Sequence, residues 1–377
     1  MYFFVIIAVV LPFLPGLDIL LSFLAPAIPN LTAYSAIALI VLPNFSMAIK
    51  FQKIFHSPIF SIILIYFAFM LITNLVLGNE FQSIIFVLIS GIAGKIAYDI
   101  QVMGLLKPGS NLEKALIFSV LVFHSVALAL WYLEVPLFDF GSAGGENFFR
   151  IEGERYRLFG TLVNPNSYAV FCVIIIIYLF FDAHKSSLRH VSIIFSIIAI
   201  ILTGSRSGLI CLTIIIIFKL LSRYRFPRDL ILVKFLALIF SLFVIILSSS
   251  QLTGVDIRFS KWLTGWQIFS QSGIYIFYGL PISEALGARE VSFSDNMILF
   301  DVFRHGVLFA TFNIIGIITF SLWILSRSQG ILNGEVTAVF CGWILLFTTN
   351  LFLIFPSILF WFVYFGSKIG RARFENV

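Results

Sequence analysis

Long runs of apolar residues, each close to the length that a helix needs to cross a lipid bilayer, recur along most of this chain. A hydrocarbon core of about 30 Å requires about 20 helical residues. Such runs lie near 2–24, 32–49, 58–78, 83–102, 115–133, 166–182, 230–249, 297–325 and 335–353, and shorter runs lie at 191–204, 207–222 and 356–367. We therefore predict an all-α, polytopic membrane protein with about twelve transmembrane helices, forming a single domain over residues 1–377.

The scarcity of charge supports this class. Only 11% of the 377 residues are charged and 60% are hydrophobic, whereas a soluble domain carries roughly 25% charged residues. This composition excludes a soluble enzyme, a nucleic-acid-binding protein and a secreted disulfide scaffold. The cysteines Cys172, Cys211 and Cys341 all lie inside apolar runs, where we expect small apolar packing groups. The first residues lack the basic segment and cleavage site of a signal peptide, so we expect a retained first span.

The positions of lysine and arginine predict the orientation. If both termini are cytoplasmic, the short cytoplasmic segments hold fourteen of the 24 basic residues, as the positive-inside rule requires. Two long polar segments, 134–165 and 251–295, then form the outer, periplasmic loops. The outer side holds eight basic residues, of which seven are arginine: Arg150, Arg155, Arg157, Arg206, Arg258, Lys261, Arg289 and Arg304. Arginine binds phosphate through a planar bidentate fork, although it could also simply anchor loops to lipid headgroups.

Three outer segments contain the candidate functional residues. The first segment, 150–167, runs from the polar loop into an apolar run. Pro165 restrains its turn, and Asn166 or Ser167 could cap the helix that follows. Together with Arg155 and Arg157, the start of that helix would attract an anion. The alternative is an ordinary capped helix.

The second segment, 202–208, joins two apolar runs that are both too short to cross a bilayer. Runs of this length span only about 21–24 Å as helices. Because their cytoplasmic ends are marked by Arg189 and Lys219, we expect Arg206 at the hairpin tip to lie at membrane depth. An arginine at that depth is costly and indicates a functional site, unless it snorkels to the surface or thins the bilayer.

The third segment, 294–306, ends the second polar loop and begins a long apolar run. On a helix, Asp301 would share one face with Arg304 and His305, which follow it by three and four residues. This cluster could neutralise itself, or Arg304 could contact a ligand while His305 carries a proton. Elsewhere, Glu152 and Glu154 could ligate a divalent ion, but loop carboxylates are usually solvated, and we predict no metal site and no cofactor.

Together, "RLFGTLVNPNSYA" (157–169), "LTGSRSGL" (202–209) and "SDNMILFDVFRHGVLF" (294–309) resemble the O-antigen polymerase and ligase superfamily, in the order found in that family. The resemblance implies a fold similar to GT-C-type glycosyltransferases, in the bacterial inner membrane with a periplasmic active site. Polymerases of this family transfer a growing glycan from undecaprenyl diphosphate to a new carrier-linked repeat unit. Ligases usually have a histidine just before the asparagine of the third segment. Here Asp295 precedes Asn296, which favours a polymerase.

The resemblance also assigns roles to individual residues. The leaving group is a lipid diphosphate, whose charge preorganised arginines can neutralise without a metal. Diphosphate binding falls to Arg157, Arg206 and Arg304. The sugars or the arginines would be oriented by asparagines, namely Asn164, Asn166 and Asn296. The base that accepts the proton of the acceptor hydroxyl stays open between three candidates: Glu154, Asp295 and His305.

The expected partners are an undecaprenyl-diphosphate-linked oligosaccharide, membrane lipid and a chain-length regulator protein, but no nucleic acid. Two alternatives remain: an O-antigen ligase-like transferase, and a transporter or flippase of lipid-linked oligosaccharide. Secondary transporters commonly show two related halves with matching interrupted helices. This chain instead concentrates its polar residues in two unequal outer loops.

Overall fold

The computed structural model of the chain is mostly helical. It describes residues 94, 97–98, 101, 108–133, 149–152, 155–158, 165–222, 263–271, 273–279, 297–327, 333–348 and 357–375. The elements are helix α8 (Asn111–Tyr132), strands β1 (Phe149–Glu152) and β2 (Arg155–Leu158), and helices α9 (Pro165–Phe181), α10 (Ser187–Thr203), α11 (Arg206–Leu221), α14 (Tyr275–Tyr278), α16 (Met297–Arg327), α17 (Gly334–Thr348) and α18 (Ser357–Glu375). The runs at 2–24, 32–49, 58–78 and 230–249, and nearly all of 83–102, lie outside the described residues.

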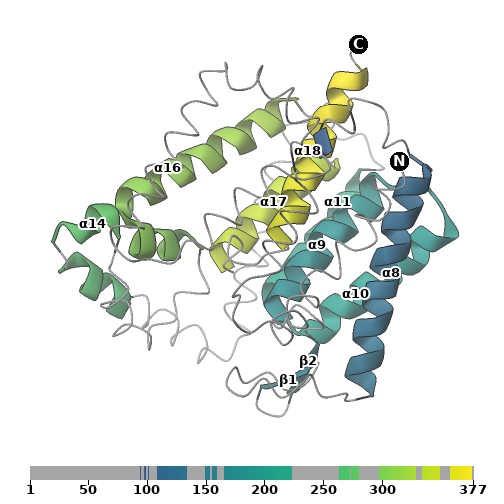
Figure 1. Cartoon of the computed structure of the whole chain (residues 1–377), viewed down its shortest axis with the longest axis horizontal. Helices are drawn as coiled ribbons and strands as arrows, with labels where there is room; N and C mark the ends of the chain where they lie inside the picture. The colour runs from purple at the N-terminus through teal and green to yellow at the C-terminus, as the bar shows by residue number, and fades with distance from the viewer. Residues whose placement is uncertain are drawn as a thin grey trace, which may run out of the picture.

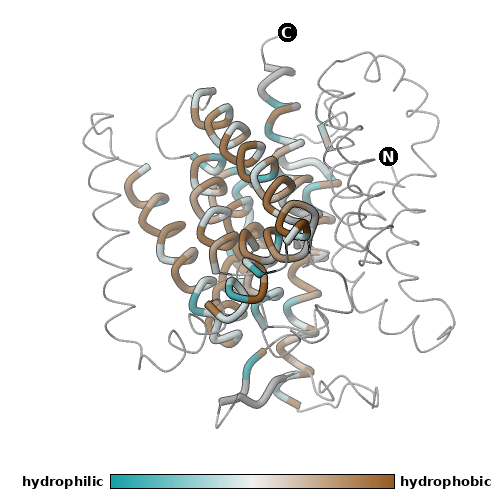
Figure 2. The backbone as a smooth tube through the Cα atoms, turned by 90° about the vertical axis from the view of Figure 1, so that its left-hand side faces the viewer, coloured by the Kyte–Doolittle hydropathy of each residue, from teal (hydrophilic) through white to brown (hydrophobic). Residues whose placement is uncertain are grey.

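Helix α9 forms the centre of a helical bundle (Figure 1). Its sequence is apolar around the whole circumference, which is typical of a helix buried on all sides. It packs against α10, α11, α17 and α18, and most of its residues are buried. The helices of the bundle are hydrophobic along most of their length (Figure 2).

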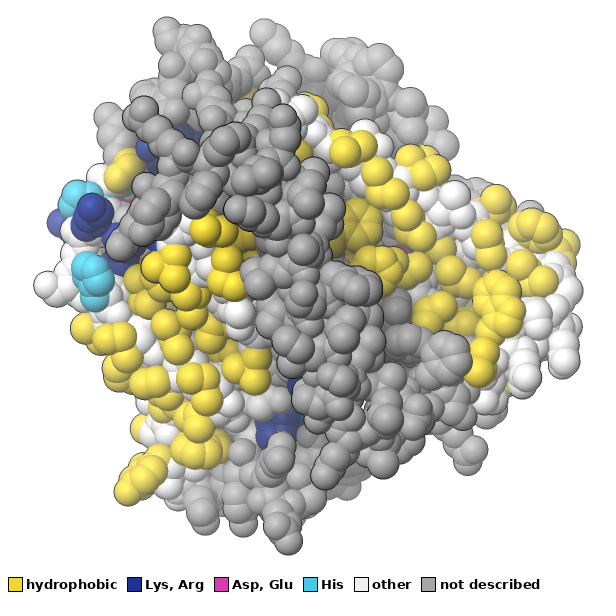
Figure 3. Space-filling view, turned by 180° about the vertical axis from the view of Figure 1, so that it is seen from behind, with side chains coloured by type: hydrophobic (Ala, Val, Ile, Leu, Met, Phe, Trp, Pro, Cys, Tyr) yellow, Lys and Arg dark blue, Asp and Glu magenta, His cyan; other side chains and the backbone are white. Residues whose placement is uncertain are grey.

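Among the described residues, two helices are long and apolar enough to cross a membrane: Asn111–Tyr132, which is α8, and His305–Ser326, which is most of α16. Three further apolar helices, α9, α10 and α17, are shorter. These helices coincide with predicted apolar runs. From behind, the described surface shows many hydrophobic side chains, with histidine and basic side chains gathered at its left edge (Figure 3). By length and composition, the part of the chain that the structure describes therefore contains helices that could cross a membrane.

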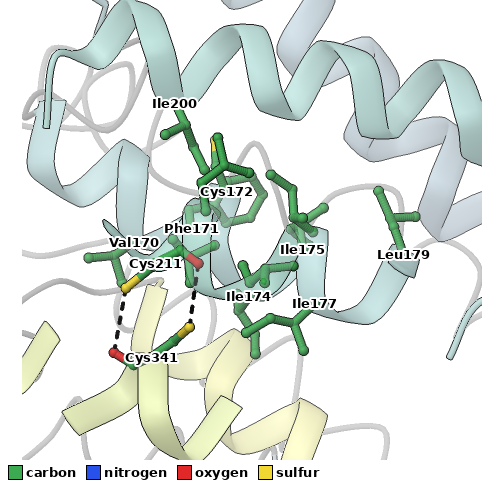
Figure 4. Close-up of a cluster of buried hydrophobic side chains, with 14 of the residues drawn as sticks. Val170, Phe171, Cys172, Ile174, Ile175, Ile177, Leu179, Ile200, Cys211 and Cys341 are labelled. Atoms are coloured by element: carbon green, nitrogen blue, oxygen red, sulfur yellow. Dashed lines mark hydrogen bonds between the residues drawn. The ribbon is translucent and has the colours of Figure 1, made fainter. Parts of the chain in front are cut away.

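The cysteines pack as apolar groups inside this bundle, as predicted. Cys172, Cys211 and Cys341 are all buried thiols. Cys211 of α11 and Cys341 of α17 face each other, and each sulfur lies 3.8 Å from the carbonyl oxygen of the other residue (Figure 4). This reciprocal contact brings α11 and α17 close together beside α9.

A short β-hairpin, which the sequence did not predict, precedes α9 in this mostly helical chain. Strands β1 and β2 pair antiparallel, with Arg150 opposite Arg157 and Glu152 opposite Arg155. The hairpin brings Arg157 to the ends of α8, α9 and α10, against which β2 packs.

Helix α16 is broken at Gly306, which has φ 82° and ψ 165°. These angles lie outside the helical region and are accessible to glycine. The side-chain amide of Asn313 donates a hydrogen bond of 3.0 Å to Asp301 across the break. In a straight helix an offset of twelve residues would separate the two residues by about 18 Å along the axis. The third segment therefore folds back against the long apolar helix, instead of continuing straight into it.

Candidate functional site

Arg157 joins the first and second segments. Its Nε donates a hydrogen bond of 2.6 Å to the carbonyl oxygen of Thr203, in the last turn of α10. The C-terminal end of a helix carries partial negative charge and unsatisfied carbonyls, so a cation is favourable there. Its Nη2 donates a 3.3 Å hydrogen bond to Oδ1 of Asn166, in the first turn of α9. One arginine thus connects the start of α9 to the end of α10.

The α10–α11 turn forms as the second segment predicts, with two short helices of 17 and 16 residues. Gly204 ends α10 in the left-handed conformation at φ 59°, which suits glycine. The hydroxyl of Ser205 accepts the amide N–H of Gly208 at 3.4 Å and caps α11. A Cβ at Gly204 would lie 3.4 Å from Nε of Arg157, so the turn and the arginine are in direct contact.

Arg206 is the first residue of α11, and its side chain is exposed. It lies two residues beyond Gly204, at the helix end that carries partial positive charge. Its predicted depth in the membrane stays a prediction.

Close packing brings α11 against the first turn of α9. A Cβ added to Gly208 would lie only 2.8 Å from Cβ of Ala169, so glycine is what allows this approach. Arg157, Asn166 and the 203–206 turn therefore share one place, which we call the α9–α10–α11 junction. Helix α9 begins at Pro165. Because Asn166 and Ser167 are then inside the first turn, the prediction that either one caps the helix is wrong.

The third segment lies with a different set of elements. Helix α16 packs mainly against α14 and α17. Near the break, Phe303 is buried edge-on against Phe269, with ring centroids 5.2 Å apart. His305 is buried and lies edge-on to Phe309 at 4.8 Å. Among the described elements, α16 has no such extensive packing with β2, α9 or α10.

Asp301 is the charged group of the third segment whose surroundings are described. It lies before the candidate span His305–Ser326, and only 4% of it is exposed. Burial raises the pKa of Asp301 from 3.8 to about 7, and the hydrogen bond from Asn313 partly opposes that rise. Asn313, beyond the break, donates a hydrogen bond to Asp301. The predicted cluster of Asp301 with Arg304 and His305 stays a prediction, because the side chain of Arg304 lies outside the described residues.

The other predicted site residues are not brought to the junction by any described contact. Glu154, Asn164, Asp295 and Asn296 lie outside the described residues, and so does the side chain of Arg304. In the described ranges, no three His, Cys, Asp or Glu side chains lie together as a metal ion would require.

A buried polar chain that the sequence did not indicate crosses the bundle next to the junction. Tyr168 of α9 lies 2.7 Å from Nδ1 of His124 on α8, and Nε2 of His124 lies 3.0 Å from Ser196 of α10. All three side chains are fully buried. The sequence feature that could have indicated this chain is His124, a histidine in the middle of an apolar run. Its partners could not be predicted, because they lie 44 and 72 residues away in the sequence.

At the far end of α9, the charged groups belong to the segments predicted to be cytoplasmic. Arg189 and Lys219 donate hydrogen bonds to the last carbonyl groups of α9, where cations offset the helix dipole. Just beyond the helix, Asp182 pairs with Lys368 and accepts a hydrogen bond from Tyr364 at 2.8 Å. Arg157 and Arg206 are at the opposite end of the bundle from these cations.

A scan against models of protein families finds no match to the chain, and a search of curated proteins finds none either.

Proposed function

We propose that this protein is an oligosaccharide repeat-unit polymerase of the O-antigen type, a glycosyltransferase of the bacterial inner membrane. It would transfer a growing glycan from undecaprenyl diphosphate to a carrier-linked repeat unit on the periplasmic side. The observation that carries the proposal is the meeting of the first and second segments, where Arg157 lies against Gly204 and binds the Thr203 carbonyl. Two of the three segments that suggest the family, although distant in sequence, thus meet at one junction.

The chemistry of this junction suits a diphosphate leaving group. As the anomeric C–O bond breaks, negative charge develops on the lipid diphosphate. Arg206, at the positive end of α11, would bind that charge, and Arg157 would hold the turn beside it. Two preorganised arginines can stabilise this charge without a metal ion.

Acceptor activation needs a base, and the candidates remain Glu154, Asp295 and His305. His305 is buried on the folded-back part of α16. In this proposal, the third segment supplies the acceptor side of the reaction, and the α9–α10–α11 junction supplies the donor side. Arg304 and Asn296 would bind substrate from the third segment, and Asn164 would do so beside the start of α9.

The test is an assay with purified full-length protein in detergent and repeat units linked to lipid diphosphate, run with and without a chelator. We expect a ladder of longer lipid-linked products that the chelator does not change. Arg206→Ala should abolish the ladder, and Arg206→Lys should reduce the rate at least about tenfold because lysine lacks the bidentate fork. Lys185→Ala is the charge-matched control, because Lys185 is exposed at the opposite end of α9.

Three results would contradict the proposal. Full activity of Arg206→Lys would remove the bidentate phosphate role. Transfer of glycan to a lipid A core without a ladder would identify a ligase. Movement of lipid-linked sugar across vesicle membranes, again without a ladder, would identify a transporter.

A further inference from the structure

The polar chain next to the junction has a defined direction. The Ser196 hydroxyl donates to the carbonyl oxygen of Ser192 at 2.8 Å, and a hydroxyl has only one proton to donate. Ser196 must therefore accept the Nε2–H of His124 at 3.0 Å. Nδ1 of the neutral ring is then an acceptor, and Tyr168 donates to it at 2.7 Å. Each of these contacts has one donor and one acceptor.

The chain connects three helices at positions that are fully buried. Tyr168, His124 and Ser196 come from α9, α8 and α10, and none of them is exposed. Phe123 lies edge-on to the Tyr168 ring at 5.6 Å, and Phe171 stacks on that ring at 6.4 Å. The phenol therefore has a fixed position both through its ring and through its hydroxyl group.

Tyr168 also lies in the turn of α9 that forms the junction. Asn166, which accepts the hydrogen bond from Arg157, is two residues earlier. Two residues correspond to about 200° around a helix, so Tyr168 and Asn166 point to nearly opposite sides. Ala169 packs against Gly208 of α11 on a third side. The first turn of α9 is thus held by α8, by β2 and by α11.

We infer that Tyr168 and His124 are positioning residues, which fix the rotation of the first turn of α9 so that Asn166 meets Arg157. The inference rests on the proposed function for its effect on catalysis, but its structural part can be tested without activity. Among the described hydrogen bonds, none joins either residue to Arg157 or Arg206. Both residues therefore act on the junction through the position of Asn166. Loss of the Tyr168 hydroxyl would let the turn rotate and would loosen the contact between Arg157 and Asn166.

Helix α9 supplies a matched control. Tyr178 lies ten residues after Tyr168 and also donates its hydroxyl to α8, to Oε1 of Glu113 at 3.0 Å. Tyr168→Phe and Tyr178→Phe therefore make the same chemical change on the same pair of helices, at opposite ends. We expect both variants to fold and to lose a similar amount of thermal stability.

Two readouts separate the variants. Hydrogen–deuterium exchange across residues 165–172 should become at least about fivefold faster in Tyr168→Phe and stay within twofold of wild type in Tyr178→Phe. In the polymerisation assay, Tyr168→Phe should lower kcat about tenfold with little change in KM, whereas Tyr178→Phe should stay within about twofold. Equal effects of the two variants on exchange would overturn the inference.

A double variant separates positioning from burial of an unsatisfied group. Replacing both partners of a buried hydrogen bond by apolar groups can restore stability. Tyr168→Phe combined with His124→Leu should therefore recover most of the lost thermal stability, while exchange at 165–172 stays fast and kcat stays low. Recovery of exchange and kcat together with stability would show a merely structural role. If wild type forms no ladder, the proposed function fails, and the exchange measurements still decide the positioning role.

Discussion

Arg157 makes two hydrogen bonds in different directions, and only a guanidinium can provide both. Nε reaches the Thr203 carbonyl and Nη2 reaches Asn166. A lysine ammonium is a single point charge and cannot keep this fork geometry. We expect Arg157→Lys to lower transfer activity about tenfold to a hundredfold, which corresponds to about 1.4–2.8 kcal/mol. Lys185→Arg, at an exposed site, is the control for the exchange of arginine and lysine. Unchanged kinetics of Arg157→Lys would mean that the fork has no role.

Asp301 should make stability depend on pH. Its pKa is about 7 in the folded protein, compared with an ordinary value of 3.8. The folded state therefore holds the Asp301 proton more tightly than the unfolded state does. The contribution of this bound proton to stability is complete below about pH 4 and is lost as the pH rises to about 7. In Asp301→Asn the amide oxygen can still accept the hydrogen bond from Asn313, but no charge is buried. We expect thermal unfolding in detergent to show equal stability of the two proteins near pH 4, and a more stable variant at pH 8. A difference that is the same at both pH values would contradict the raised pKa.

The sequence could not indicate this environment of Asp301. From their spacing it placed Asp301, Arg304 and His305 on one helical face, and all three lie in the helical stretch before Gly306. What this spacing could not show is the break at Gly306, which brings Asn313, twelve residues after Asp301, back to it. A glycine in an apolar run is compatible with both a straight and a broken helix, and tertiary packing decides between them. The same limit applies to His124, whose partners come from two other helices.

At the scale of helices, local signals were more informative. The polar turn at 202–208 between two short apolar runs predicted the α10–α11 pair, and in the structure Gly204 adopts the left-handed conformation and Ser205 caps α11. The sequence placed Pro165 in the turn before α9, whereas the helix begins at this proline, which is favourable at the first helical position. The hairpin of β1 and β2 was missed because its strands are four residues long, too short for a clear alternation of polar and apolar residues.

The contact between α9 and α11 predicts different effects for two helical glycines. A Cβ on Gly208 would lie 2.8 Å from Cβ of Ala169, and neither atom can move without moving its helix. Gly208→Ala should therefore destabilise the protein by about 1–3 kcal/mol and reduce transfer activity. Gly316→Ala is the control, because nothing lies within 4 Å of its added Cβ. There alanine should stabilise the helix by up to about 1 kcal/mol. Thermal unfolding and activity of the two variants measure this contrast, and equal stability of both would contradict the close packing.

For the whole molecule, the two ends of the bundle carry the basic residues that the sequence assigned to opposite sides of the membrane. Arg189, Lys219 and the Asp182–Lys368 pair gather at one end, while Arg157 and Arg206 lie at the other. Short loops rich in lysine and arginine remain in the cytoplasm. The end with Lys185 should therefore be cytoplasmic, and the junction should face the periplasm. The proposed reaction requires this, because its acceptor and donor are presented on the periplasmic face.

Cysteine labelling can test this orientation on the full chain. Cys172, Cys211 and Cys341 are buried, so a membrane-impermeant maleimide should not label the wild-type protein. Lys185→Cys and Tyr132→Cys introduce thiols at exposed sites on opposite sides of the predicted membrane; Tyr132 is 80% exposed at the end of α8.

We expect Tyr132→Cys to be labelled in spheroplasts, and Lys185→Cys to be labelled only in inverted vesicles or after permeabilisation. The reverse pattern would place the arginine junction on the cytoplasmic side, where a polymerase that uses periplasmic carrier-linked sugars could not work. Labelling of both thiols from one side would place positions 132 and 185 on the same side of the bilayer. The chain between them would then cross the bilayer an even number of times or not at all. Either result would contradict the proposed architecture independently of any activity assay, because the positions of these thiols follow from the topology alone.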